Sequence, residues 1–132
     1  KLPLQACQFR IARPTDKLDE VVRFYKEAIG LVEIGSFNNH DGYDGIMLGL
    51  PGTTHHLEFT HYVGGSPCPA PTRDNLLVLY FDTEGKYNAA IDRMTSHGIE
   101  PVTPENPYWE GKSMTFEDPD GWSVVLFNGV FK

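Results

Sequence analysis

The chain has 132 residues, with 18 acidic and 11 basic side chains and a formal net charge of -7. A chain of this length can form one compact domain or two very small halves around a hydrophobic core. The negative charge argues against nucleic acid or an anionic membrane as a partner, because both would repel it. The longest apolar run, residues 76–81, is far shorter than the ~20 residues of a membrane-spanning helix. A small molecule is the partner that we expect.

The first half of the chain predicts a β-α-β-β-β unit, module 1, over about residues 7–63. Apolar side chains recur at helical spacing from Leu18 to Ile29. Thr15 and Asp16 precede this helix as candidates for its N-cap, and Gly30 follows it as a stop signal. Strands are predicted at Gln8–Arg13, Leu31–Phe37, Gly45–Leu50 and His55–Tyr62.

The second half repeats the same order of elements as module 2, over about residues 74–130. A proline- and glycine-rich segment, residues 64–73, separates the halves and predicts a surface linker. The second helix is expected from Thr83, its N-cap, to His97, with Gly98 as its stop. Strands are predicted at Leu76–Phe81, Pro101–Val102, Ser113–Phe116 and Trp122–Phe127. Two copies of one small unit explain this pattern.

The two cysteines, Cys7 and Cys68, are too few for a disulfide framework and lack the paired spacing of a zinc site. We interpret both as reduced thiols. This interpretation favours a cytoplasmic protein.

Five segments in a fixed order carry a resemblance to a known superfamily: AIGLVEI, LEFTHYVGG, LLVLYFD, SHGIEPV and TFEDPDGWSVVLF. Together they resemble the vicinal-oxygen-chelate superfamily, which includes glyoxalase I and the fosfomycin and bleomycin resistance proteins. The resemblance implies an α+β fold in which two β-α-β-β-β modules form a curved mixed sheet around a cup, with the helices on the outer face. It also implies a homodimer, since single-chain members usually dimerise.

Enzymes of this superfamily hold a divalent metal through one side chain from each of four strands on the inner face of the cup. The resemblance places these four positions at Arg10, Glu58, Asn75 and Val125. Glu58 alone is a usual ligand, because a guanidinium has no lone pair to donate. We therefore expect no metal cofactor. The alternative is a divalent metal held by Glu58 and His56.

Strand alternation supports this placement, because side chains at i and i+2 share a face. In the first half, His56 and Glu58 are expected to face the cup, while Leu57 and Phe59 face the helix. In the second half, Val125 and Phe127 are expected to face inward. We predict that the Arg10 guanidinium lies within ~4 Å of the Glu58 carboxylate and replaces the charge of the missing metal. The alternative interpretation of Glu58, which we favour less, is a solvated carboxylate at the end of a strand.

Further ligand-binding candidates come from the second half of the chain. Asn75 either hydrogen-bonds a ligand or serves as a turn residue. Leu77 is expected to line the apolar side of the cup with Val125 and Phe127, although core packing also explains these side chains. Trp109 and Lys112 lie in a predicted loop that lines the pocket in related proteins.

Three functions remain open at this point. The first is a metal-independent protein that binds and sequesters a small molecule, as bleomycin resistance proteins do. The second is a metal-dependent lyase or transferase of the glyoxalase I or fosfomycin resistance type, for which Glu58 is the candidate catalytic residue. The third is a structural or regulatory dimer with a vestigial cup. The altered metal positions favour the first function.

Overall fold

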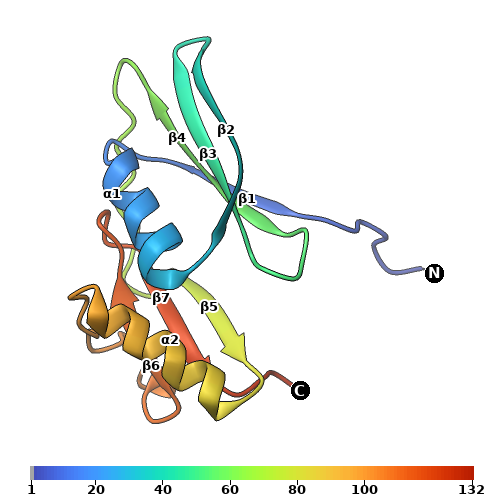
Figure 1. Ribbon diagram of the computed structural model, residues 1–132, viewed down its shortest axis with the longest axis vertical. Coiled ribbons are helices and arrows are strands. Elements are labelled where there is room, and N and C mark those ends of the chain that lie inside the picture. The colour runs from blue at the N-terminus through green and yellow to red at the C-terminus, as the bar shows by residue number, and fades with distance from the viewer. Residues whose placement is uncertain (1) are drawn as a thin grey trace. The chain divides into compact units, whose positions relative to one another are not determined.

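The computed structural model describes residues 2–132, and the chain divides into two compact units, Lys1–Cys68 and Pro69–Lys132 (Figure 1). The division falls inside residues 64–73, the predicted linker. Each unit contains a mixed β-sheet and a helical segment. The predicted α+β class is confirmed. Within residues 2–132, no helix has the length and apolar character that a membrane crossing requires.

Unit 1 is a four-stranded sheet in the order β1-β4-β3-β2. Its first strand pairs in parallel with its last, and the other pairs are antiparallel. The elements are β1 (Arg10–Pro14), α1 (Leu18–Val22), η1 (Arg23–Ile29), β2 (Val32–His40), β3 (Tyr43–Gly49) and β4 (His56–Tyr62). This is the β-α-β-β-β order that the sequence predicts.

The helical segment of unit 1 ends where the sequence predicts. It starts as α-helix and continues as the π-helical turns of η1. Gly30 then adopts a left-handed conformation, with φ of 99°. The backbone N–H groups of Gly30 and Leu31 both donate to the Tyr25 carbonyl, at 3.1 and 2.9 Å. A residue with a Cβ atom resists this conformation, which explains why a glycine ends the helix.

The prediction for the start of this helix is wrong. The N-cap position belongs to Lys17, which makes no capping bond through its side chain. Thr15 Oγ1 accepts from the Lys17 N–H at 2.9 Å. This bond closes a turn over residues 15–17, directly before α1 begins at Leu18. Asp16 Oδ1 accepts from the backbone N–H of Ser66. Both predicted caps therefore bind other backbone groups.

The helical segment of unit 1 covers one face of its sheet. The Phe59 ring of β4 stacks on the Tyr25 ring of η1, with centroids 4.9 Å apart. Val21 and Leu48 are fully buried. Phe59 thus faces the helix, as strand alternation predicts, and the next residues along β4 face the other way. We call the sheet face opposite α1 and η1 the far face of unit 1.

Unit 2 is a three-stranded sheet in the order β5-β7-β6. Its elements are β5 (Leu76–Phe81), α2 (Glu84–Ser96), η2 (Pro107–Trp109), β6 (Ser113–Glu117) and β7 (Ser123–Asn128). The predicted strand Pro101–Val102 is reduced to one antiparallel bridge between Val102 and Thr115. Proline has no N–H to donate to a ladder, so Pro101 does not extend this pairing.

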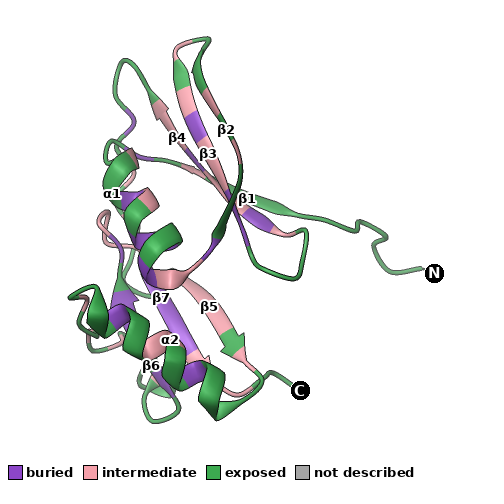
Figure 2. Ribbon diagram, viewed as in Figure 1, coloured by how far each residue is buried: buried purple, intermediate pink, exposed green. Residues whose placement is uncertain are grey.

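Helix α2 confirms both of its predicted ends. Thr83 Oγ1 accepts from the Lys86 N–H at 3.2 Å, and Gly98 has a φ of 72°. The helix packs on one face of the sheet through Tyr87, whose ring lies 6.1 Å from that of Phe81. The longest buried run of unit 2 lies in β7 (Figure 2). We call the sheet face opposite α2 the far face of unit 2.

The DPDG turn between β6 and β7 is held by one carboxylate. Asp118 Oδ1 accepts from the N–H groups of Asp120 and Trp122, at 2.8 and 3.0 Å. Gly121 has a φ of 87°, a conformation that favours glycine. The turn therefore has a structural explanation, because it fixes the alignment of β6 with β7.

Candidate functional site

The far face of unit 1 brings together three side chains that the sequence selects. In the parallel pair of β1 and β4, Arg10 lies beside His56, and Ala12 lies beside Glu58. Residues paired across two strands share a face, and so do residues two apart in one strand. Arg10, His56 and Glu58 therefore lie on the face opposite the helix.

These three side chains contact one another. Arg10 Nε donates to His56 Nε2 at 2.9 Å, and Arg10 Nη1 lies 3.5 Å from Glu58 Oε2. The predicted proximity of the Arg10 guanidinium to the Glu58 carboxylate is confirmed. The Arg10 side chain is 46% exposed and that of Glu58 is 14% exposed. We call these three residues the arginine network.

Both ring nitrogens of His56 have partners. Nε2 accepts from Arg10, and Nδ1 lies 3.0 Å from the Thr54 carbonyl oxygen. A carbonyl oxygen only accepts hydrogen bonds, so Nδ1 carries the proton and Nε2 keeps the lone pair. The neutral ring with its proton on Nδ1 satisfies both contacts. The lone pair on His56 Nε2, which could otherwise coordinate a metal ion, thus accepts the hydrogen bond from Arg10.

The arginine network does not fit the divalent metal that the superfamily implies. A zinc or similar ion needs about three or four protein donors. Across residues 2–132, no three or more His, Cys, Asp or Glu side chains gather in a group that could hold a metal ion. The carboxylate of Glu58 already faces a guanidinium, and the lone pair of His56 faces the same group. This donor set suits direct contact with an organic molecule better than metal coordination.

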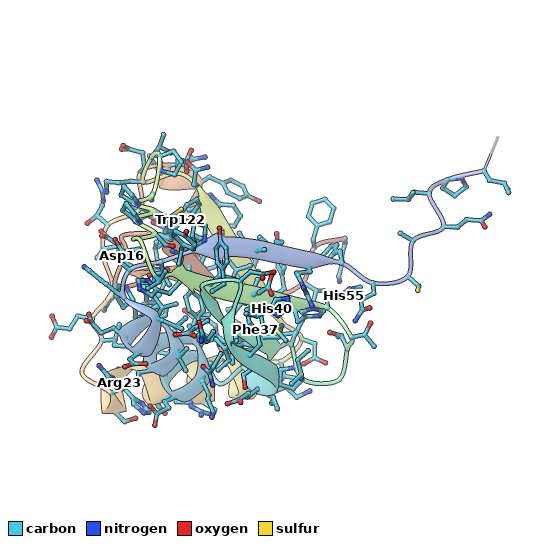
Figure 3. All side chains as sticks on the ribbon, turned by 90° about the horizontal axis from the view of Figure 1, so that it is seen from above. Asp16, Arg23, Phe37, His40, His55 and Trp122 are labelled. Carbon is cyan, nitrogen blue, oxygen red and sulfur yellow. The ribbon has the colours of Figure 1, made fainter. Side chains whose placement is uncertain are left out.

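Apolar side chains extend the far face of unit 1 away from the arginine network. A Cβ atom at Gly45 would meet the Phe37 ring, and one at Gly35 would meet the Met47 methyl group at 2.8 Å. Glycine at both positions therefore lets a large apolar side chain lie across the strand. Phe37 and His40 both belong to β2 and are labelled in Figure 3. Their ring centroids are 6.3 Å apart.

A tyrosine pair lies at the far end of the same face. Tyr43 of β3 and Tyr62 of β4 are cross-strand partners, and their ring centroids are 4.8 Å apart. Both rings are about two-fifths exposed. Rings with one exposed surface can stack on a planar ligand. The analysis of the sequence missed Phe37, Met47 and the tyrosine pair, although period-two alternation along β3 places Tyr43 and Met47 on one face.

The far face of unit 2 differs from the prediction at one residue, Leu77. Val125 pairs with Val78, and Phe127 pairs with Tyr80, so these four share a face. Leu77 pairs with Val124 and therefore lies on the helix face. The expectation that Leu77 shares a face with Val125 and Phe127 is wrong, because Val78 and Tyr80 are the residues of β5 that pair with them.

Asn75 lies outside the strand and within a turn. Its Oδ1 accepts from Thr72 Oγ1 at 2.7 Å, and its N–H lies 3.4 Å from the Thr72 carbonyl oxygen. Of the two interpretations of Asn75, the turn residue agrees with these contacts. In unit 2, the position equivalent to Arg10 is Leu76, which pairs with Ser123 two residues before Val125.

The ring of Trp109 lies on the far face of unit 2. It meets the Phe127 ring edge-on at 6.1 Å, and the Phe127 ring is 5.4 Å from that of Tyr80. Tyr108 adds a fourth ring, 4.9 Å from Trp109. We call these four residues the aromatic cluster. Lys112 is exposed, and its carbonyl accepts from the Asn128 N–H at 2.8 Å.

The two halves of the chain match known domains. Residues 9–60 match the YycE-like N-terminal domain, and residues 74–128 match the YycE-like C-terminal domain. The chain is also 50% identical to the uncharacterized protein YycE of Bacillus subtilis over 124 residues, which cover 94% of this chain and 89% of that protein. The chain belongs to the YycE-like family.

Solved structures extend this relationship to the superfamily. A YycE protein of unknown function from Bacillus subtilis, described as a candidate glyoxalase/fosfomycin resistance protein, matches with a TM-score of 0.89 and 48% identity, over 97% of this chain and 93% of that chain. The fosfomycin resistance protein FosX from Mesorhizobium loti matches with a TM-score of 0.72 and 14% identity, over 98% and 95% of the two chains. An antibiotic binding protein from Streptomyces sp. CB03234 matches with a TM-score of 0.69 and 20% identity, over 98% and 100%. The last two likenesses concern the fold, which is that of the vicinal-oxygen-chelate superfamily.

Proposed function

We propose that this YycE-like protein binds a small molecule without a metal ion and sequesters it. The arginine network carries this proposal. Arg10 supplies a fixed positive charge at a position where the resemblance places a metal ligand, and its guanidinium contacts both His56 and Glu58. A guanidinium offers five N–H donors in a plane. Arg10 commits two nitrogens to its neighbours, and its 46% exposed side chain can donate its other N–H groups to a ligand.

The apolar part of the same face supports the type of ligand that we propose. Phe37, Met47 and the tyrosine pair form a surface of rings and a thioether beside the arginine network. Ligand sites typically combine such apolar walls with a few placed polar groups. A planar, amphipathic molecule matches this combination. The likeness of fold to an antibiotic binding protein agrees with a binding function.

We further infer a cytoplasmic homodimer. Val32 and Ile34 on the edge strand β2 are 51% and 55% exposed, and such apolar side chains at a sheet edge favour burial against a second copy. Sedimentation equilibrium tests the dimer, and a monomer at micromolar concentration would contradict it.

A fluorescence titration with 8-anilino-1-naphthalenesulfonate tests the binding function. This planar amphipathic probe is added in the presence of EDTA to wild-type protein, to Arg10→Met, and to the matched control Arg23→Met. Arg23 is exposed on η1, on the opposite face of unit 1. We expect wild type and R23M to bind equally and R10M to bind about tenfold more weakly, since a charge-assisted hydrogen bond is lost.

Two outcomes would contradict the proposal. One is equal affinity of R10M and wild type for the probe. The other is stoichiometric metal, measured by elemental analysis after loading with Mn²⁺, Zn²⁺ or Ni²⁺ and desalting. The second outcome would favour the metal-dependent lyase or transferase.

A further inference from the structure

A buried hydroxyl group in unit 2 has no hydrogen-bond partner among the described residues. Thr115 of β6 is 2% exposed, and its Oγ1 atom neither donates to nor accepts from any described group. A buried hydroxyl group without a partner destabilises the folded state, because it has lost its hydrogen bonds to water. Native proteins retain few such groups, and those that remain usually have a specific structural or functional reason.

Strand pairing places this hydroxyl on the far face of unit 2. Thr115 pairs with Val125, which in turn pairs with Val78. These three paired residues form one row across the sheet. The neighbouring row on the same face, two residues along each strand, consists of Ser113, Phe127 and Tyr80. Two residues of a strand span about 7 Å. The hydroxyl group therefore lies one row from two rings of the aromatic cluster.

The topology of the unit does not require a hydroxyl group at this position. In unit 1 the equivalent residue is Met47, which pairs with Glu58 as Thr115 pairs with Val125. An apolar side chain thus fills the same place in the related sheet. Ser113, the other hydroxyl residue of these two rows, donates to the Trp109 carbonyl. Thr115 differs from Ser113 in lacking such a partner.

We propose that Thr115 Oγ1 is a ligand-binding group that donates a hydrogen bond to an uncharged carbonyl oxygen of a planar aromatic ligand. The rings of Phe127, Tyr80 and Trp109 take the aromatic part of that ligand by stacking. The two rows contain only uncharged side chains, which favours a neutral acceptor over a carboxylate. The hydroxyl is buried, so a ligand reaches it only after neighbouring side chains of the far face move aside.

This inference rests on the proposed binding function and is tested with two matched probes. 2-Acetylnaphthalene carries a carbonyl oxygen, and 2-isopropenylnaphthalene has the same shape with a CH₂ group in its place. Isothermal titration calorimetry measures both against wild type, Thr115→Val and Thr115→Ser. We expect wild type and T115S to bind the ketone about tenfold more tightly than the alkene. T115V loses this preference and binds the two probes equally.

Thermal unfolding without any probe supplies a second measurement. Valine has a methyl group where threonine has its hydroxyl group. T115V therefore removes the unsatisfied polar group and keeps a side chain of nearly the same shape. We expect its Tm to rise by about 3–6 °C. A lower Tm for T115V would show that the hydroxyl has a structural partner, and it would overturn the inference.

The outcomes separate this inference from the proposed function. Equal ketone preference in wild type and T115V, with R10M still impaired in binding 8-anilino-1-naphthalenesulfonate, would overturn the role of Thr115 alone. Failure of wild type to bind either naphthalene would overturn it as well. Loss of the ketone preference in T115V together with a higher Tm supports the inference. If the Thr115 hydroxyl only stabilised the fold, its removal would lower the Tm and leave the preference unchanged.

Discussion

The two units share the parallel pairing of their first and last strands, although unit 1 has four strands and unit 2 has three, and they differ in the chemistry of their far faces. In each unit the first strand pairs in parallel with the last, and the helix crosses between the first two strands. Equivalent positions hold Arg10, His56 and Glu58 in unit 1, and Leu76, Ser123 and Val125 in unit 2. A charged network in one unit thus corresponds to three uncharged side chains in the other.

This difference shows which side chains the topology requires. The helix faces of both units are apolar and aromatic, with Phe59 against Tyr25 in unit 1 and Phe81 against Tyr87 in unit 2. Burial of these rings drives the helix onto the sheet. The far faces lie opposite the helix of their own unit, so packing against that helix sets no requirement on their side chains.

Exchange of the residue types at one pair of equivalent positions should have the largest effect. Val125 is fully buried, and its row contains Val78 and Thr115. Val125→Glu buries a carboxylate beside uncharged neighbours, and we expect it to lower the free energy of unfolding by about 3–5 kcal/mol. Urea denaturation followed by circular dichroism measures this loss.

The reciprocal change in unit 1 is the matched control. Glu58→Val leaves Arg10 without its carboxylate, but the Arg10 side chain is 46% exposed and water can solvate it. We expect E58V to change the free energy of unfolding by no more than about 1 kcal/mol. Similar losses of unfolding free energy for E58V and V125E would contradict the difference in burial that we assign to the two far faces.

A smaller difference is expected between the starts of the two helices. Thr83 caps α2 through its hydroxyl group, whereas Lys17 at the equivalent position of α1 makes no capping bond through its side chain. Thr83→Ala should cost about 1 kcal/mol, and Lys17→Ala only a few tenths. Urea denaturation of the two variants measures both costs. A Lys17→Ala cost as large as that of Thr83→Ala would show that α1 has a cap of equal strength.

The smallest expected effect concerns pH and the helix face of unit 2. Burial raises the pKa of Tyr87 above its ordinary value of 10.0. Above pH 10 the unfolded chain therefore releases this proton while the folded chain keeps it. Stability then falls as pH rises, until the folded phenol also ionises.

The variant Tyr87→Phe isolates this contribution. The difference in unfolding free energy between wild type and Y87F should be constant from pH 8 to 9 and should decline above pH 10. Urea midpoints at a series of pH values measure it. A difference that stays constant through pH 11 would contradict the assigned burial of the phenol.

Local sequence signals determined a large part of this structure. Gly30 ends the first helix, Thr83 starts the second, and the DPDG turn joins β6 to β7. Each depends on residues a few positions apart, because caps and turns are short-range hydrogen-bonded structures. Alternation along β4 also placed His56 and Glu58 on one face and led to the contact with Arg10.

The register between distant strands was decided by the tertiary structure alone. Leu77 lies on the helix face because β5 pairs with β7 across more than forty residues of chain, and a shift of one residue turns every side chain to the other face. The same pairing leaves the Thr115 hydroxyl without a partner beside the aromatic cluster. Such a register depends on how α2 packs on one face of the sheet that β5 and β7 form, which no local pattern of residues specifies.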